Sequence, residues 1–252
     1  MKKEIIKMNI AVETLGKDII STFVFKGYIG ALNAGGNVEK ISLPKVSIER
    51  SKMVNGNYMP IGSCQYMRYF FDLYDIETPK PISMPEQLKK FSGRNFYVVA
   101  DKSEIVDYPV FVKPYEDVKV FTGFVARSAK DWELYPELLE WSGTILCCDP
   151  IESELVAEYR CFVHNGKIVN ISYYDGTDPT IFPNIYTIMQ CIHLYDDAPV
   201  AYTMDVGVDS YGWTHLIECN DMWAIGAYGI NEDDYFEMLK DRWNEILTEN
   251  KI

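Results

Sequence analysis

The sequence predicts a mixed α/β protein, and three observations support that prediction. Two β-rich runs flank Asn165-Gly166, and Asn-Gly between apolar runs is the strongest short-range signal for a β-hairpin. Near the end, apolar residues from Tyr235 to Leu247 recur at helical spacing, which predicts an amphipathic helix. The chain has 252 residues, of which 48% are hydrophobic, so it is long enough for one large or two small domains with a buried core.

The first 95 residues predict a mixed unit. A strand is expected at Ile5–Val12, and the glycine-rich run Gly27–Asn37 is expected to be a loop, since it matches no dinucleotide or phosphate-binding pattern. Ser63 is a candidate N-cap for a helix. Thr78–Pro81 breaks the chain, and a short helix is expected at Glu86–Phe91.

From about residue 96 the pattern changes to strands. The expected strands are Phe96–Ala100, Val110–Lys113, Thr144–Cys148, Leu155–Val163, Lys167–Tyr174, Ala201–Val208 and Thr214–Asn220. The last four make two hairpins.

Composition excludes several classes of function. The 24 Lys+Arg against 37 Asp+Glu give a net charge of −13, which argues against a passive nucleic-acid binder. We see no signal peptide and no adequate membrane span. The 6 cysteines contain no CxxC pair and are expected to be reduced thiols in a cytoplasmic protein. The 3 histidines lack metal-ligand spacing, so no zinc site is expected.

Two acidic side chains of the second hairpin are expected to face each other. With Tyr211 and Gly212 as the turn, Asp205 pairs with Glu218. Directly opposed like charges destabilise a sheet, and a divalent cation between them would remove the repulsion. Asn220 shares the face of Glu218, so the three side chains predict an incomplete oxygen cage of the kind Mg²⁺ uses with nucleotide phosphates. An exposed acidic face without metal remains the alternative, and a three-residue turn would break the pairing.

Three basic side chains are candidates for binding an anion. Arg160 shares a strand face with Glu158, where its guanidinium either forms a local salt bridge or grips a phosphoryl or carboxylate group. Lys113 lies in an otherwise apolar strand, where it either extends outward or neutralises phosphate. Lys119 follows six residues later.

Taken in order, these residues resemble the ATP-grasp superfamily over about residues 96–230. The matching segments are Val110–Pro114, Lys119 with Phe121–Gly123, Glu158–Val163, Tyr173–Gly176, Tyr202–Gly207 and Leu216–Asp221. Two spaced lysines followed by the Asp…Glu-x-Asn ending are the most specific combination. The chain looks most like a compact clade from bacteria and phages, most of whose members have no assigned substrate.

The resemblance implies a role for each matching residue. The implied nucleotide contacts are Lys113, Lys119, Cys148, Glu152, Glu154 and Glu158. Leu146–Leu155 would be the hinge that holds adenine through its backbone, and either Glu152 or Glu154 would take the ribose hydroxyls. Asp205, Glu218 and Asn220 would hold one or two Mg²⁺ ions. Arg160 would steady either the transferring phosphoryl group or the acceptor carboxylate, and Lys113 would also take part in catalysis.

The implied fold is an ATP-grasp fold, in which two α/β subdomains grip ATP, here preceded by a short pre-ATP-grasp domain. The expected boundaries are 1–95 for the reduced substrate-side domain and 96–252 for the ATP-grasp domain, itself divided into 96–150 and 151–252. The implied function is an ADP-forming, Mg²⁺-dependent carboxylate–amine or carboxylate–thiol ligase that acts through an acyl phosphate on small-molecule or peptide substrates. A phosphotransferase, or an ATP-binding module without turnover, remains the alternative, and the oligomeric state is open.

Overall fold

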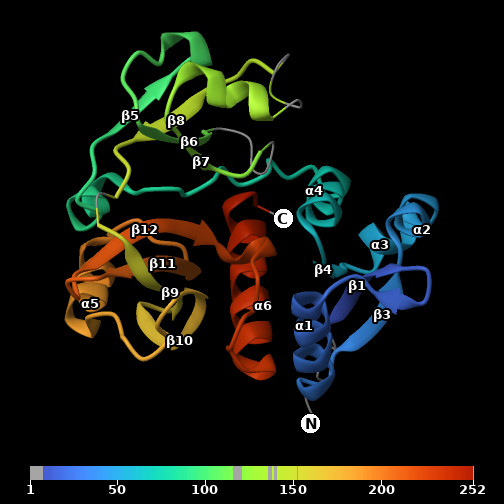
Figure 1. Ribbon diagram of the computed structural model, residues 1–252. Coiled ribbons are helices and arrows are strands. Elements are labelled where there is room, and N and C mark those ends of the chain that lie inside the picture. Colours follow the sequence, from blue (N-terminus) through green and yellow to red (C-terminus); the bar gives the residue numbers. More distant parts are fainter. Residues whose placement is uncertain (1–7, 116–120, 136–137, 139–140, 152, 252) are drawn as a thin grey trace.

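The computed structural model describes residues 8–115, 121–135, 138, 141–151 and 153–251, and it contains three separate sheets. Figure 1 shows the N-terminal sheet on one side of the C-terminal helix and the sheet formed by residues 155–221 on the other. The third sheet lies above them in this view. The mixed α/β prediction is therefore confirmed.

The N-terminal unit is built around a central buried strand. β1 (Asn9–Leu15) pairs in parallel with β3 (Asn37–Ile41) and β4 (Met59–Ile61), and antiparallel with β2 (Asp18–Ile19). Parallel neighbours require crossover connections. These contain the helices α1 (Thr22–Asn33), α2 (Leu43–Ile48) and α3 (Arg50–Asn55), and α4 (Cys64–Leu73) follows β4. Ser63 caps α4 by accepting from the backbone N–H of Tyr66, as its sequence position predicts.

The expectation of a loop at Gly27–Asn37 is wrong for its first half. Residues 27–33 belong to α1, and β3 begins at Asn37. Gly27 and Gly30 serve helix packing, whereas Gly35 lies in the turn after α1 with φ +74°. A Cβ added to Gly30 would lie 2.2 Å from the carbonyl oxygen of Glu232 and 2.6 Å from the Cβ of Phe236. α1 can therefore approach α6 (Glu232–Glu249) this closely only without a side chain at position 30.

The other two sheets come from the second half of the chain. One has the strand order β5-β8-β6-β7, and the other has the order β10-β9-β11-β12. The strands are β5 (Phe96–Val99), β6 (Val110–Pro114), β7 (Phe124–Ala126), β8 (Ile145–Cys148), β9 (Leu155–His164), β10 (Lys167–Gly176), β11 (Ala201–Asp209) and β12 (Thr214–Asp221). The remaining elements are α5 (Ile185–Leu194) and the 3₁₀ turns Glu86–Phe91, Lys102–Glu104, Ala129–Leu134 and Met222–Ala224. The hairpins at Asn165-Gly166 and at residues 210–212 are confirmed.

Three hydrophobic cores hold the elements together. The apolar stripe of α6 joins the core of the N-terminal unit, where Phe71 packs between Trp223 and Trp243 with ring centroids 5.4 and 5.9 Å away. α5 covers one face of the β9–β12 sheet, and a third core lies against the β5–β8 sheet. In the described ranges no helix is both long and apolar enough to cross a bilayer.

The register of the β11–β12 hairpin changes along its length. Next to the turn, Val208 pairs with Thr214 and Val206 with Leu216. The turn therefore holds one residue more than the sequence argument assumed. A register shift at Ile217 compensates, so that Asp205 still pairs with Glu218. Without that bulge, Glu218 would point to the opposite face of the sheet, since a one-residue slip reverses every side chain.

The packing of α1 on α6 gives a stability prediction. We expect Gly30→Ala to lower the free energy of unfolding by about 1–2 kcal/mol, because overpacking against a backbone carbonyl exceeds the gain of about 1 kcal/mol in helix propensity. Gly27→Ala is the matched control, since its added Cβ meets the Ile61 side chain at 2.8 Å, and that side chain can rotate away. Urea denaturation of both variants measures the difference. Equal stability of the two would contradict the close contact.

Candidate active site

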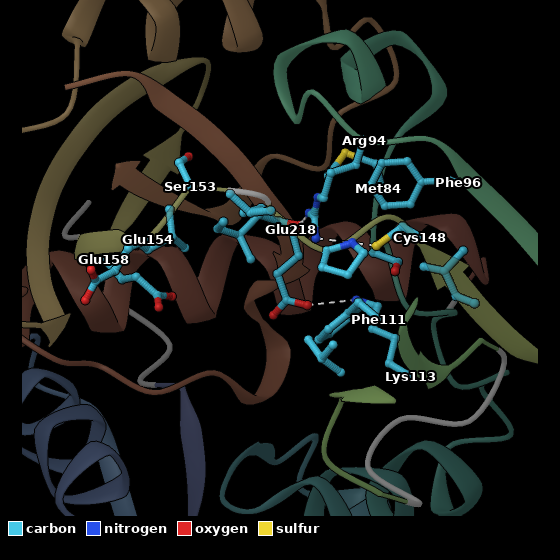
Figure 2. A pocket seen from close by; sticks show the side chains of 17 residues that line it. Met84, Arg94, Phe96, Phe111, Lys113, Cys148, Ser153, Glu154, Glu158 and Glu218 are labelled. Carbon is cyan, nitrogen blue, oxygen red and sulfur yellow. Dashed lines mark hydrogen bonds and ion pairs between the residues drawn. The ribbon is translucent and has the colours of Figure 1, made fainter. Parts of the chain in front are cut away.

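Two cavities meet between the β5–β8 sheet and the β9–β12 sheet. The first has a volume of about 460 Å³ and the second about 590 Å³. Both are lined by Lys113 and Glu218, whose side chains form an ion pair with Nζ and Oε2 2.7 Å apart. Figure 2 shows this pair in the first cavity, with Glu154 and Glu158 on one side of Glu218 and Arg94 and Cys148 on the other. Cavities of this size are typical of small-molecule sites.

Three charged residues lie side by side on the neighbouring strands β9, β11 and β12, and of these Glu218 lines both cavities. Asp205 on β11 pairs in register with Arg160 on β9 and with Glu218 on β12. Arg160 donates two hydrogen bonds to the Asp205 carboxylate, from Nε at 2.8 Å and from Nη2 at 2.6 Å. Both side chains are buried. Burial raises the pKa of Asp205, although the Arg160 guanidinium opposes that shift.

Lys113 neutralises the second carboxylate. Burial acts to raise the pKa of Glu218, but the charge and hydrogen bond of Lys113 outweigh it and hold the pKa below its usual range. The opposed carboxylates are thus each matched by a cation from another strand. This pairing balances the two negative charges without a divalent ion, and the metal site stays a prediction. The pairing also excludes the local salt bridge between Arg160 and Glu158, since Glu158 instead accepts from the Tyr174 hydroxyl at 2.8 Å.

The three predicted metal ligands converge. The amide Nδ2 of Asn220 lies 2.9 Å from Oε1 of Glu218 and 3.3 Å from Oδ2 of Asp205. The positive end of the amide dipole thus occupies the place of a cation between two carboxylates. Rotating the amide by half a turn would present its oxygen there, which gives the all-oxygen donor set that Mg²⁺ prefers. The described residues contain no group of three or more His, Cys, Asp or Glu side chains able to hold a metal.

The remaining predicted site residues are distributed as follows. Cys148, Glu154 and Glu158 line the first cavity, and Asn220 lines the second. Lys119 and Glu152 lie outside the described residues. Burial raises the pKa of the Cys148 thiol.

Arg160 lies one layer behind the cavities. It is not among the described residues that line either of them. Its guanidinium carbon lies 4.9 Å from the ring centre of Tyr228 and 5.8 Å from that of Tyr174, and these two rings stack on each other. The sequence predicted that the Arg160 guanidinium either forms a local salt bridge or grips a phosphoryl or carboxylate group. In this structure it binds the carboxylate of Asp205.

Sequence reasoning missed Arg94, which lies in the first cavity. Its Nη2 donates to the carbonyl oxygen of Ile217 at 2.7 Å, and its Nη1 lies 3.4 Å from Sγ of Cys148. Ile217 is the residue that the register shift adds to β12, so Arg94 fixes the bulge that aims Glu218. A lone arginine between Gly93 and Asn95 carries no sequence signal for this contact.

A cluster around Asp209 links the β11–β12 turn to the segment that precedes β9. No sequence pattern indicated it. The buried carboxylate of Asp209 accepts from Ser153 Oγ at 2.7 Å, and its Oδ2 lies 2.9 Å from Nε2 of His215. It also accepts from the backbone N–H groups of Tyr211 and Trp213. Burial works in the opposite direction, yet these contacts lower the pKa of Asp209 to about 2. The cluster holds Ser153 in place beside Glu154 at the cavity wall.

Comparisons with known proteins establish the family of the chain. A family model described as ATP-grasp domain, R2K clade family 2, matches residues 91–238, and the chain belongs to that family. The resemblance to ATP-grasp proteins found in the sequence is therefore confirmed. No curated protein matches the chain in sequence.

Solved structures with the same fold cover nearly the whole chain. D-alanine–D-alanine ligase from Bacillus anthracis aligns with a TM-score of 0.59 and 12% identity, over 97% of this chain and 99% of that one. N5-carboxyaminoimidazole synthetase from Staphylococcus aureus aligns with a TM-score of 0.53 and 13% identity, over 94% of this chain and 78% of that one. At these identities the likeness establishes the ATP-grasp fold, and the fold prediction is confirmed.

The Asp209 cluster predicts a pH-dependent loss of stability. Because the folded pKa lies below the ordinary value of 3.8, the stabilisation is complete above about pH 4 and disappears as the pH falls toward 2. We expect Asp209→Asn to cost about 1–2 kcal/mol at pH 7, less than the full pKa shift would give, because the partly open His215 lets water screen the pair. Urea unfolding at pH 7, 4 and 2.5 tests this.

The exposed Asp18 supplies the control. Asp18→Asn is expected to change stability by less than about 0.5 kcal/mol at each pH. A stability gap between wild type and Asp209→Asn that stays constant down to pH 2.5 would contradict the ionic role of Asp209.

Proposed function

We propose that this protein is an ATP-dependent ligase that joins a carboxylate to an amine, or to a thiol, through an acyl-phosphate intermediate. The observation that carries the proposal is the meeting of two cavities at the Lys113–Glu218 pair. One cavity is suited to a nucleotide and the other to an acceptor, and the charged groups needed to move a phosphoryl group lie where they join.

The first cavity is the proposed nucleotide site. Phe96, Phe111 and Leu146 give it apolar walls for a base, and Glu154 and Glu158 supply oxygens at its other side. Glu154 is the proposed ribose contact. Lys113 would then exchange its ion pair with Glu218 for contact with the phosphates, which a flexible ammonium group does readily.

The second cavity is the proposed acceptor site. It extends from the Lys113–Glu218 pair past Trp223 and Ile225 to Cys64 on the N-terminal unit. In the proposed first step, an acceptor carboxylate oxygen forms a bond to the γ-phosphorus while the bond to the β-phosphate oxygen breaks, and ADP leaves with the electron pair. In the second step an amine or thiol attacks the acyl carbon, phosphate leaves, and the nucleophile loses its proton.

Asp205, Glu218 and Asn220 are the proposed Mg²⁺ ligands. Bound there, Mg²⁺ would neutralise the negative charge of the phosphates. The chain's own groups do the positioning. Arg160 holds Asp205 in one orientation, and Arg94 fixes the bulge that aims Glu218. Catalysis by such a site depends on positioning and charge stabilisation. The six free thiols and the use of ATP support a cytoplasmic location.

The test is a screen for ADP release. Purified protein, ATP and Mg²⁺ are incubated with pools of amino acids, peptides and amines, and products are identified by mass spectrometry. The proposal predicts ADP formation that requires both a carboxylate and a nucleophile, with a product that has lost one water. We expect Lys113→Met to reduce turnover by roughly 10²-fold or more, the scale for losing one preorganised charged group.

Lys167→Met is the control, because Lys167 is exposed at the start of β10. Its turnover should match that of wild type. ADP release with a phosphorylated acceptor and no need for a nucleophile would indicate a phosphotransferase instead. Tight ATP binding with no ADP release under any pool would indicate a binding module.

A further inference from the structure

Ser83 carries two unfavourable features at the place where the cavities join. Its backbone has φ +59°, a left-handed conformation that costs a residue other than glycine about 1–3 kcal/mol. Its hydroxyl Oγ is buried and has no hydrogen-bond partner among the described residues. A buried polar group without a partner is costly and is uncommon in native proteins.

The backbone of Ser83 is fixed by the strand that carries the candidate metal ligands. Its carbonyl oxygen accepts from the N–H of Cys219 at 2.6 Å, which forms a single bridge to β12. Cys219 lies between Glu218 and Asn220 in the sequence, so the segment that precedes β5 is fixed beside both of these side chains. Ser83 itself is only 9% exposed and lines both the first and the second cavity.

These observations exclude some roles for the hydroxyl. A serine nucleophile needs an adjacent base to accept its proton, and Ser83 Oγ has no such partner in the described structure. A role in stability is also excluded, because an unpaired hydroxyl on a strained backbone destabilises the fold. A hydroxyl can still donate one hydrogen bond to an anionic oxygen that arrives with a ligand.

We infer that the Ser83 hydroxyl is a phosphoryl-binding donor, which hydrogen-bonds an oxygen of the ATP γ-phosphate at the junction of the two cavities. The inference rests on the proposed placement of ATP in the first cavity. It adds one contact to that placement, a hydrogen bond that only the terminal phosphate of ATP accepts. The Cys219 bridge fixes the backbone that carries Oγ at the junction, so only rotation of the hydroxyl is needed to follow the phosphoryl group.

The experiment compares ATP with ADP as probes, because only ATP carries the γ-phosphate. Calorimetry is performed with each nucleotide and Mg²⁺ on wild type, Ser83→Ala and Ser83→Gly. Both variants lack the hydroxyl, and we expect each to lose roughly 10- to 100-fold in ATP affinity, the value of a hydrogen bond to a charged group, with ADP affinity unchanged. The melting temperature should be unchanged or higher in Ser83→Ala, and higher still in Ser83→Gly, because glycine also relieves the backbone strain.

Tyr202→Phe is the matched control. The Tyr202 hydroxyl is also buried without a described partner, but it lies in the core under α5 and lines neither cavity. Its removal should leave both affinities unchanged. Equal ATP affinity in wild type and both Ser83 variants would overturn the inference, as would an equal loss for ATP and ADP. Binding of ATP far from the first cavity would instead overturn the proposed function, and Lys113→Met separates the two cases because it should weaken ATP binding whether or not Ser83 takes part.

Discussion

Two carboxylates on adjacent strands, Asp205 and Glu218, impose the constraint on which the rest of the site depends. Such a pair costs free energy in a partly buried sheet unless each charge is matched. The protein matches them from opposite directions, with Arg160 from the next strand and Lys113 from the facing sheet. The Arg160–Asp205 pair is internal to one sheet, whereas the Lys113–Glu218 pair joins two. The second pair is therefore the one that a ligand between the sheets can replace.

The supporting contacts extend outward from that pair. Arg94 fixes the Ile217 bulge, and the Ser83 carbonyl binds the strand two residues further on. Behind Arg160, the segment that carries Tyr228 is fastened to the N-terminal unit, because Lys26 donates to the carbonyl oxygens of Tyr228 at 2.8 Å and of Ile230 at 2.5 Å. The N-terminal unit thus contributes both to the wall of the second cavity and to the support of the charged row.

Local pattern predicted the strands of the second half of the chain except β7, both hairpins and the cap at Ser63, because period and turn chemistry are properties of short segments. It did not predict β2, β3 and β4 or the helices α1, α2, α3 and α5. It predicted the facing of Asp205 and Glu218 as well, although through an assumed turn that the structure replaces with a longer turn and a compensating bulge. It failed where the cause lies in contacts distant along the chain. Gly30 was predicted to lie in a loop, because its contact with α6 cannot be read from the local sequence. The hydrogen bond from Arg94 to β12 likewise joins residues that are far apart in the sequence, so no local pattern predicts it.

We propose that Lys113 holds Glu218 until a metal–nucleotide complex binds and releases it. The most direct measurement is ATP affinity by calorimetry with and without Mg²⁺, in wild type and in Glu218→Gln. In wild type, Mg²⁺ should strengthen ATP binding strongly. In Glu218→Gln that enhancement should be lost, while ATP binding without Mg²⁺ should become tighter, because Lys113 is then free and a repelling charge is gone. The same enhancement by Mg²⁺ in both proteins would contradict this role of Glu218.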